Sequence, residues 1–433
     1  MTEAAVPGPE PRAQPSRPTP ATPLTTADGR PLRVSLARAQ SLSRRRAFLL
    51  VLPLLLFVVV TFVVPIGQML GRSVYNAGFS ANMPRISAWF AEHPRGTPPD
   101  ELAWEALAKD LAAAAELRTI GVVGTRINYD MPGTRSLFTS TGRQTRSDFE
   151  PPWDATLTGI DPKWGDPALW NVMRNASSAL TGNFYLAAVD RTRTPDGGIA
   201  QAPPQQRVYL MLFQRTFLLS LLITGLTFLL GFPVAHMLAT LPTRKSNLLM
   251  ILVLLPFWTS LLVRTTAWIV LLQQQGVIND LLVWTGLIGD RQRLQMVYNQ
   301  TGTIIAMTHV LLPFMILPLY SVMRTINPSY VRAARSLGAS SWTAFRRIYF
   351  PQTLPGLGAG ALLVFILAVG YYITPALVGG SSGQLISNMI ALHMTDTLNW
   401  SLAAALATLL LAGVLVLYWI YDRLVGIDNL KLG

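Results

Sequence analysis

Six long apolar runs, separated by polar stretches, dominate the pattern along this 433-residue chain. A helix needs about 20 apolar residues to cross roughly 30 Å of hydrocarbon, where an open backbone has no other way to satisfy its polar groups. We therefore predict an all-α polytopic membrane protein with six transmembrane helices. The expected spans are residues 47–70, 213–238, 248–272, 302–323, 356–378 and 402–421.

These runs divide the chain into five parts. Residues 1–43 are rich in proline and basic side chains, which predicts a disordered tail. Residues 44–71 read as a first transmembrane helix that stays in place as a signal anchor, because the apolar run is too long for a cleaved signal peptide. The rest is expected to comprise an insertion at 72–207, a core of five spans at 208–425 containing a polar loop at 325–355, and a tail at 426–433.

The charge distribution orients these parts across the membrane. The chain carries a formal net charge of +13, but only 13% of its residues are charged, against about 25% in a soluble domain. Arg44, Arg45 and Arg46 precede the first run, and the positive-inside bias places them, both termini and the 325–355 loop in the cytoplasm. Residues 72–207 then lie outside, with 14 Lys+Arg against 14 Asp+Glu. We therefore attribute the excess of basic residues to membrane topology and to contact with lipid headgroups, and not to nucleic-acid binding.

The sequence supports a structural prediction for only part of the outer insertion. Asp100 is expected to cap a helix that runs to Arg118, with Asp110 the one residue that breaks its apolar stripe. Residues 128–198 show no repeat and support no assignment. A contact surface for a binding protein, a spacer and a self-packed lid all remain open for this insertion.

The polar loop between the fourth and fifth runs predicts a helical hairpin. Pro328 can start a helix because its missing N–H costs nothing at the first turn. Gly338 then permits a sharp turn, and Ser340 or Ser341 can cap a second short helix that ends at Pro351 and Pro355. The plainer alternative is an amphipathic loop lying on the headgroups through Trp342, Arg346 and Arg347.

The spacing within this hairpin resembles the EAA loop of binding-protein-dependent ABC importer permeases. The pair Ala333–Ala334 is followed by Gly338, then Ile348, then Pro351. The segments 255–260, 311–320 and 335–340 resemble the spermidine/putrescine branch, and the similarity extends from about residue 210 to the carboxyl end. The resemblance implies the type I importer fold and an ATPase-coupling surface formed by Arg332, Ala333, Ala334, Leu337, Gly338, Ala339, Ser340, Ile348 and Pro351.

Two residues depart from the pattern of these relatives. Arg332 stands where a glutamate is usual, and Phe350 stands where a leucine is usual. The reversed charge puts any family salt bridge at that position in doubt. We expect Arg332 to pair instead with an acidic side chain on this chain's own ATPase.

Catalytic motifs are missing from the sequence. No G-x-x-x-x-G-K-[ST] phosphate loop occurs, there is no cysteine, and His236, His309 and His393 are isolated from one another. We therefore expect a transport subunit that is not an enzyme and binds no cofactor or metal, with ATP and Mg²⁺ on a separate subunit. The resemblance implies as partners a cytoplasmic ATPase dimer, a second homologous permease subunit, a periplasmic solute-binding protein and the lipid bilayer of a bacterial inner membrane.

Several aromatic and charged residues near the span ends are candidates for the solute pathway. Ionisable residues in spans are costly and therefore mark functional positions, and aromatic faces attract organic cations. Helix packing for Arg264, and interface anchoring for the aromatic residues, are the plainer alternatives. The candidates are Trp258, Arg264, Tyr371, Tyr372, Asp396 and Trp400.

The fifth run is interrupted by Pro375, Gly379 and Gly380, which predicts a broken helix with a re-entrant or gate segment through residues 384–393, or else a plain exposed loop.

The resulting hypothesis is that the chain forms one half of the permease core of an ATP-driven importer for a polyamine. An opine, an amino acid derivative or an anion is the alternative solute. Two alternatives belong to other classes of protein. A secondary transporter would be indicated by inverted repeats and by acidic residues within the membrane. A membrane-anchored scaffold that acts through its outer domain would keep its function if the 325–355 loop were scrambled.

Overall fold

The computed structural model describes residues 32–144, 150–194 and 197–425, with side chains from residue 40 to residue 423. Residues 1–31 of the tail predicted at 1–43, and the whole tail predicted at 426–433, lie outside these residues, whereas residues 32–43 are helical. The chain divides into two units, residues 1–67 and 68–433, which are described separately.

The first unit contains most of the first apolar run. Helix α1 (Leu32–Val58) passes through a π turn, η1 (Val59–Val63), into α2 (Val64–Val74), whose end belongs to the second unit. The helical stretch apolar enough to span a membrane is Gln40–Val74, longer at both ends than predicted. Arg44, Arg45 and Arg46 continue the helix because arginine is a good helix former.

The insertion, which the sequence left largely unassigned, is a helical domain. Asp100 does cap α4, accepting a hydrogen bond from the Ala103 N–H at 2.9 Å. The elements are α3 (Pro84–Glu92), α4 (Glu101–Glu116), α5 (Ile120–Asn128), α6 (Thr134–Gln144), α7 (Trp153–Ile160), η2 (Pro162–Gly165), α8 (Pro167–Ala176), α9 (Asn183–Ala188), the antiparallel pair β1 (Arg191–Arg193) and β2 (Ile199–Gln201), and η3 (Pro204–Gln206).

Buried tryptophans organise the core of this domain. The Trp164 ring is fully buried and its Nε1–H donates to Thr141 Oγ1 at 3.0 Å, while Trp170 Nε1–H donates to the Trp164 carbonyl at 2.8 Å. Trp170 meets the Trp104 ring edge-on at 4.8 Å between centroids. The ring N–H groups of Trp164 and Trp170 thus each have a partner inside the core, whereas the buried Trp89 Nε1–H has none among the described residues.

Asp110, read from sequence as a break in an apolar stripe, is a structural carboxylate. It is fully buried, accepts a hydrogen bond from the Ile86 N–H at 2.9 Å, and pairs with the Arg85 guanidinium at 3.2 Å. Burial raises the pKa of Asp110, against the opposing effects of the Ile86 N–H and Arg85. The residue therefore joins α4 to the start of α3.

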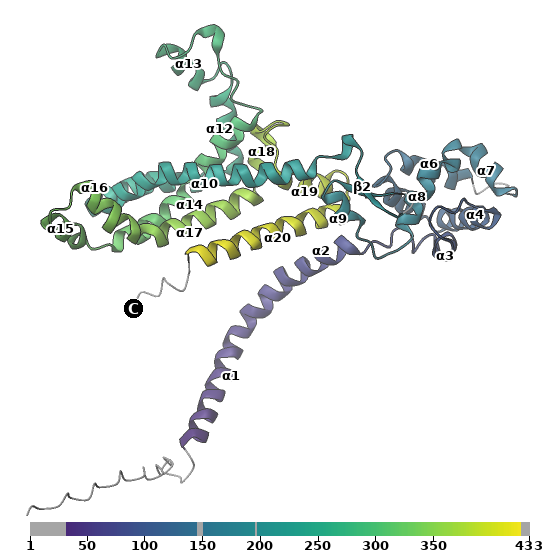
Figure 1. The fold of residues 1–433 in the computed structure, drawn as a ribbon, viewed down its shortest axis with the longest axis horizontal. Helices are drawn as coiled ribbons and strands as arrows, with labels where there is room; N and C mark the ends of the chain where they lie inside the picture. The colour runs from purple at the N-terminus through teal and green to yellow at the C-terminus, as the bar shows by residue number, and fades with distance from the viewer. Residues whose placement is uncertain (1–31, 145–149, 195–196, 426–433) are drawn as a thin grey trace, which may run out of the picture. The chain divides into compact units, whose positions relative to one another are not determined.

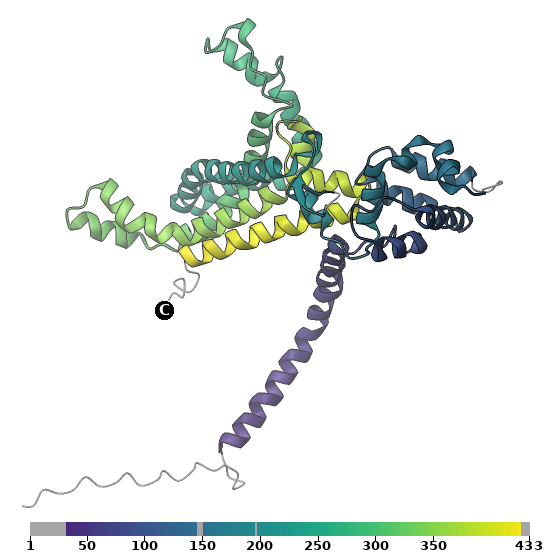
Figure 2. The same cartoon turned by 45° about the vertical axis from the view of Figure 1, so that its right-hand side comes forward.

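Four long helices form the membrane core. Helices α10 (Tyr209–Thr240), α14 (Gln300–Thr325), α17 (Phe350–Gly370) and α20 (Trp400–Val425) run side by side in both views (Figures 1 and 2). Gly231 on α10 allows close approach to α14, since a Cβ there would lie 3.2 Å from Met315. Glycine at such crossings lets helices pack closely where lipid provides no hydrophobic drive.

The third predicted span, 248–272, is wrong as a single helix. It is split into α11 (Thr243–Leu254) with η4 (Leu255–Trp258), and α12 (Leu261–Leu272) followed by α13 (Val277–Trp284), and the two parts are bent by 98°. Pro256 lacks the N–H needed to continue the helix, and Thr259 and Ser260 are extended. The described residues thus hold five continuous candidate spans, or six if this bent pair counts as one. A short turn, η5 (Asp290–Gln292), leads on toward α14.

The fifth predicted span, 356–378, is displaced toward the polar loop. One helical stretch runs from Ser341 to Gly370 through α16 (Ser341–Ala344), a π turn η6 (Phe345–Tyr349) and α17. The helix therefore does not end at Pro351 or Pro355 as predicted. Within the π turn the Phe350 N–H already bonds back five residues to Phe345, and Pro351 takes the first turn of α17, where its missing N–H is tolerated.

Candidate functional site

The polar loop builds its first helix from local signals. The Asn327 side chain accepts the Ser329 N–H at 2.9 Å and caps α15 (Pro328–Ser336). At the other end Gly338 adopts φ +89°, and the Gly338 and Ala339 N–H groups bond back to the Arg335 and Ala334 carbonyls. This is a Schellman ending, which needs a left-handed residue and therefore favours glycine. The predicted turn at Gly338 is present.

The second helix packs against the membrane core. The Ser340 side chain, one of the two predicted caps, accepts the Thr343 N–H at 3.2 Å. Phe345 then meets Phe232 of α10 edge-on at 6.1 Å, and the Tyr349 hydroxyl lies 3.0 Å from His236 Nδ1. Because α16 continues into α17, a push on the loop acts directly on a core helix.

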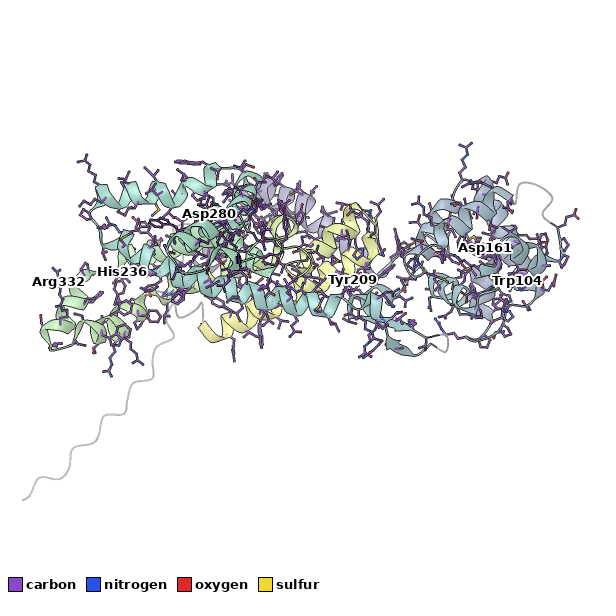
Figure 3. The ribbon with its side chains drawn as sticks, turned by 90° about the horizontal axis from the view of Figure 1, so that it is seen from above. Trp104, Asp161, Tyr209, His236, Asp280 and Arg332 are labelled. Atoms are coloured by element: carbon purple, nitrogen blue, oxygen red, sulfur yellow. The ribbon has the colours of Figure 1, made fainter. Side chains whose placement is uncertain are left out.

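The outer face of the loop exposes both apolar and charged side chains. Leu337 is 89% exposed, and Trp342, Arg332 and Ala333 are also exposed, while Val331 and Phe345 on the other face pack against the core. The structure forms no ion pair through Arg332 with any described residue. Figure 3 shows Arg332 at one end of the second unit, with Trp104 and Asp161 of the insertion at the other. The other predicted coupling residues lie in the same hairpin, with Gly338 and Ser340 exposed and Ala334, Ala339 and Ile348 half-buried; Pro351, at the base, is exposed.

Three of the predicted pathway residues lie on elements that meet near the outer half of the core. Arg264 is on α12, and Tyr371 and Tyr372 join α17 to α18 (Ile373–Val378). Thr265 and Thr374 bring α12 and α18 together, with their hydroxyls 3.4 Å apart. The two tyrosine carbonyls accept hydrogen bonds from Ser387 and Asn388 of α19 (Ile386–Thr395), at 2.6 and 2.8 Å.

The other three predicted pathway residues are dispersed. Trp258 is exposed at the bend before α12. Trp400 lies under the Arg72 guanidinium, 5.6 Å from its ring centroid, so its face is already occupied by a cation of this chain. Asp396 is exposed at the end of α19 and lines a cavity outside the core.

That cavity has a volume of about 640 Å³ and lies between the insertion and the outer ends of α10, α19 and α20. The sequence did not indicate it, because its walls come from four separate stretches of chain. The charged side chains in its walls are Asp130, Arg135, Arg191, Arg193 and Asp396. Tyr209 and His393 also line it, with Tyr209 Oη 2.8 Å from His393 Nε2.

Asp190 is a further residue that sequence reasoning missed. Its carboxylate accepts the N–H groups of Val208, Tyr209 and Leu210 at 2.9 to 3.1 Å, and so caps the start of α10. A carboxylate is stabilised at a helix N-terminus by the free N–H groups and the helix dipole. No local pattern reveals this cap, because Val208 lies 18 positions after Asp190 in the sequence.

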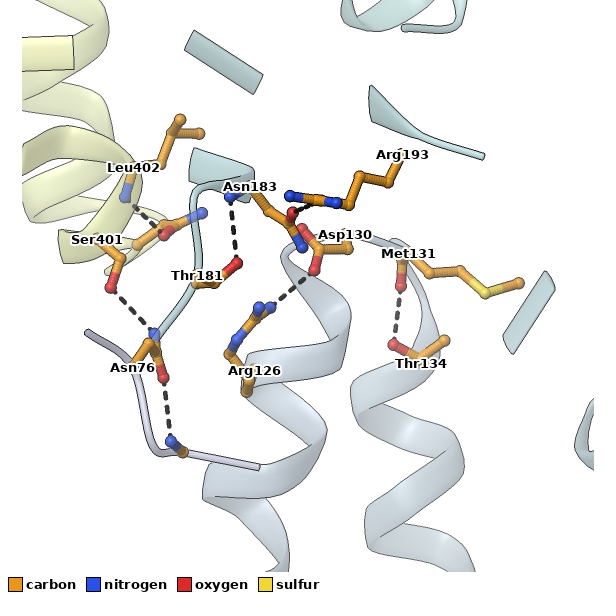
Figure 4. A network of polar contacts seen from close by, with 12 residues as sticks. Asn76, Arg126, Asp130, Met131, Thr134, Thr181, Asn183, Arg193, Ser401 and Leu402 are labelled. Atoms are coloured by element: carbon orange, nitrogen blue, oxygen red, sulfur yellow. Dashed lines mark hydrogen bonds and ion pairs between the residues drawn. The ribbon is translucent and has the colours of Figure 1, made fainter. Parts of the chain in front are cut away.

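A polar network joins the insertion to the outer end of the core (Figure 4). Asn76 Nδ2–H donates to Ser401 Oγ at 3.0 Å, and the Tyr129 hydroxyl donates to the Leu398 carbonyl at 2.7 Å. Leu398 has φ +54°, an unfavourable region for leucine, so this turn is held by its surroundings. The insertion is thus hydrogen-bonded to the turn that precedes α20.

The predicted interruption after the fifth run is a tight glycine turn. A Cβ on Gly379 would lie 2.5 Å from Thr303 Oγ1, and one on Gly380, whose φ is +51°, would lie 2.3 Å from the Tyr298 carbonyl. Only glycine fits so close to the start of α14. The run is broken at Tyr371–Tyr372, between α17 and α18, and again at these glycines, while Pro375 lies within α18. Whether the segment re-enters the membrane stays a prediction.

Comparison with known proteins places the core, and not the insertion, in a family. Residues 210–426 match the profile of the binding-protein-dependent transport system inner membrane component. The spermidine/putrescine transport system permease protein PotB of Escherichia coli is 36% identical over 211 residues, which cover 48% of this chain and 76% of that protein.

One further relative and one solved structure carry other names. A probable sulfate transport system permease protein of Marchantia polymorpha is 27% identical over 237 residues, covering 53% of this chain and 80% of that protein. A solved bacterial ABC transporter involved in the import of the acidic polysaccharide alginate matches with TM-score 0.42 and 19% identity, covering 52% of this chain and 80% of that one.

Proposed function

The chain belongs to the family of binding-protein-dependent transport system inner membrane components, and from this premise we propose that it moves a polyamine into the cytoplasm as half of the permease core of an ABC importer. It is a multi-pass permease of the inner membrane. Both termini and the 325–355 loop lie on the cytoplasmic side, where an ATPase dimer holding ATP and Mg²⁺ docks. A periplasmic binding protein delivers the solute to the opposite side.

One observation supports the docking proposal above all others. The hairpin presents an exposed Leu337 and Arg332 on a rigid frame, and its second helix runs without a break from Ser341 to Gly370. Closure of an ATPase dimer against this surface shifts α17, and with it the α18–α19 segment, which alternates access to the cavity between this chain and its partner permease.

Arg332 specifies the chemistry of the docking contact. A guanidinium that is exposed and has no ion-pair partner within the described residues suits an acidic side chain on the ATPase. Arg332→Glu should weaken ATPase association, and a matched Asp or Glu→Arg change on the ATPase should restore it. Unchanged ATPase assembly and transport in Arg332→Glu would show that this pairing does not exist.

The polyamine proposal has a narrower base. It is supported by the 36% identity to a spermidine/putrescine permease and by aromatic faces near the pathway, which attract organic cations by about 0.5–2 kcal/mol each. The test is uptake of labelled putrescine and spermidine by cells with and without this chain, with ornithine, sulfate and an opine as competitors. Competition by unlabelled polyamine alone supports the assignment.

An anion is the second candidate solute. The similarity to a probable sulfate permease, and the three arginines in the outer cavity against two aspartates, favour it. In the same uptake assay, sulfate accumulation that depends on this chain, without polyamine accumulation, would replace the polyamine assignment and leave the importer mechanism in place.

A further inference from the structure

The cavity of about 640 Å³ has walls from both the insertion and the core. Arg135 of α6 and Arg191 and Arg193 of β1 line it on the insertion side. His393 of α19 and Asp396 at the end of that helix line it on the core side. Sites for small molecules have volumes of roughly 300–1,000 Å³. The cavity is therefore large enough to hold a small organic molecule.

The positive charges in its walls have no carboxylate partners. Arg135, Arg191 and Arg193 form no ion pair with any described residue. Arg193 donates through Nε–H to the neutral Asn183 side chain at 2.8 Å (Figure 4). Arg191 and Arg193 are two residues apart on β1, so they project from one face of that strand. The insertion thus presents three guanidinium groups to one cavity.

The two carboxylates in the walls do not offset these charges. Asp130 is paired with the guanidinium of Arg126, which is 2% exposed and lies 2.8 Å away (Figure 4). Asp396 accepts a hydrogen bond from the neighbouring Thr395 hydroxyl at 3.1 Å and has no cationic partner among the described residues. Three guanidinium groups therefore face a single uncompensated carboxylate.

Three asparagines in the walls add further hydrogen-bond donors. Asn128 Oδ1 accepts two backbone N–H groups, at 2.8 and 3.3 Å. Asn175 Oδ1 accepts from Arg95 at 2.9 Å, and Asn183 Oδ1 accepts from Arg193. A backbone N–H or a guanidinium can only donate, so these contacts fix which amide atom is the oxygen. The amide groups are thus left with their NH2 ends free to bind a ligand rich in acceptors.

We propose that this cavity binds a small organic or inorganic oxyanion with two or more negative charges, carried by carboxylate or phosphate groups. Guanidinium groups bind both kinds of oxyanion through paired hydrogen bonds. A small dication such as putrescine does not suit these walls. The bound anion contacts α6 and β1 on one side and the end of α19 on the other, so it ties the insertion to the core. The proposal does not rest on the proposed function, because the charges of the cavity are the same whatever the core transports.

Titration of the purified full-length chain at constant ionic strength tests this site, with succinate, citrate and inorganic phosphate as probes. We expect saturable binding of at least one of them, without competition by putrescine. Arg135→Gln and Arg191→Gln should each weaken that binding by at least about tenfold, because each removes a charged, bidentate donor. Arg118→Gln, at an exposed arginine of the insertion that does not line the cavity, is the matched control and should leave binding unchanged.

A substitution with the opposite expected sign separates binding from folding. Asp396→Asn should tighten anion binding severalfold, because it removes the one uncompensated negative charge from the walls. A variant that is merely misfolded cannot bind more tightly. The proposal would be overturned by an absence of saturable binding for all three anions, by equal losses in Arg191→Gln and Arg118→Gln, or by weaker binding in Asp396→Asn.

Two sources supply such an anion: a solute on its way to the core, and a ligand that stays in the cavity. Uptake into proteoliposomes holding the complete transporter distinguishes them. ATP-driven accumulation of the bound anion identifies it as the solute, whereas binding without accumulation identifies a resident ligand, and both results support the site. If no solute of any kind is taken up, the proposed function fails, while anion binding that is lost in Arg191→Gln still supports this site.

Discussion

The 327–350 hairpin and the 72–207 insertion are built in opposite ways. The hairpin is about two dozen residues long, and Leu337 is the most exposed of its large apolar side chains. It is fixed by caps, a Gly338 turn and a continuous helix into the core. The insertion of 72–207 buries its large side chains, among them Trp164, around its own core. The hairpin therefore presents its apolar side chains to a partner, whereas the insertion uses its own to stabilise its fold. Only the hairpin lies within the family profile.

This difference shows where function constrains sequence. The proposed ATPase contact requires particular exposed residues at set spacings, and such spacings can be recognised in a sequence. A self-packed domain needs only a good core, and many sequences satisfy that need.

Leu337→Asp should produce the largest effect on ATPase assembly. A charge on the most exposed apolar residue of the docking surface should abolish ATPase co-purification, with at least about a tenfold loss, as expected when a hot-spot contact of 2 kcal/mol or more is removed. Leu117→Asp, at a 73% exposed leucine of the insertion, is the control and should assemble normally. Similar losses in both variants would erase the distinction between the two regions.

Trp164→Ala should act on the opposite region. Removing a fully buried tryptophan is expected to cost about 3–5 kcal/mol and to expose the insertion to limited proteolysis. ATPase co-purification should persist, because the hairpin has its own roots in α10 and α17. An insertion that stays resistant to protease would mean that Trp164 does not support its core.

Gly338→Val should have an intermediate effect. The left-handed backbone at φ +89° costs roughly 1–2 kcal/mol for an ordinary residue and more for a β-branched one, so the turn should open and ATPase association should weaken. Gly338→Asn is the matched control, since asparagine adopts this conformation readily. A Cβ meets no atom within 4 Å there, so equal losses in both variants would point to a contact rather than to backbone strain.

Asp110→Asn should give the smallest change, visible in the pH dependence of the stability of the insertion. Because burial raises the pKa of Asp110 in the folded protein, the folded state holds a proton that the unfolded state releases above about pH 3.8. The contribution of this group to the free energy of unfolding therefore falls as pH rises through the folded pKa, then stays constant.

An asparagine side chain cannot titrate in this range, so the Asp110→Asn variant should lack the pH-dependent contribution of this carboxyl group. The free energy of unfolding of the variant should therefore fall less between pH 4 and pH 7 than that of wild type. Proteolysis of the insertion in the full-length chain at several pH values measures this difference. A wild-type stability that instead rises more steeply than that of the variant would show that the Ile86 N–H and Arg85 outweigh burial at this site.

The sequence predicts those parts of the fold that depend on neighbouring residues. The apolar runs, the Asp100 cap and the Gly338 turn are all local, and all are present. The 98° bend at Thr259–Ser260 was missed because both halves of that run are apolar, and hydropathy does not record direction. The helix through Pro351 was missed because the π turn that precedes it has no pattern of its own.

Parts of the site that depend on distant residues could not be predicted. Asp190 reaches the start of α10 across a β-hairpin, and Tyr129 reaches Leu398 from 269 residues away. Among the pathway candidates, composition did not reveal that Trp400 is covered by Arg72. Such contacts are set by tertiary packing, which leaves no periodic trace in one sequence.

Solute uptake into proteoliposomes holding the complete transporter tests the central claim most directly, that force from an ATPase enters through the 327–350 hairpin. With binding protein and labelled polyamine on one side, accumulation should require ATP on the hairpin side, persist when ion gradients are collapsed, and disappear in Leu337→Asp. Accumulation that continues without ATP, or that survives Leu337→Asp while stopping when ion gradients collapse, would contradict the account.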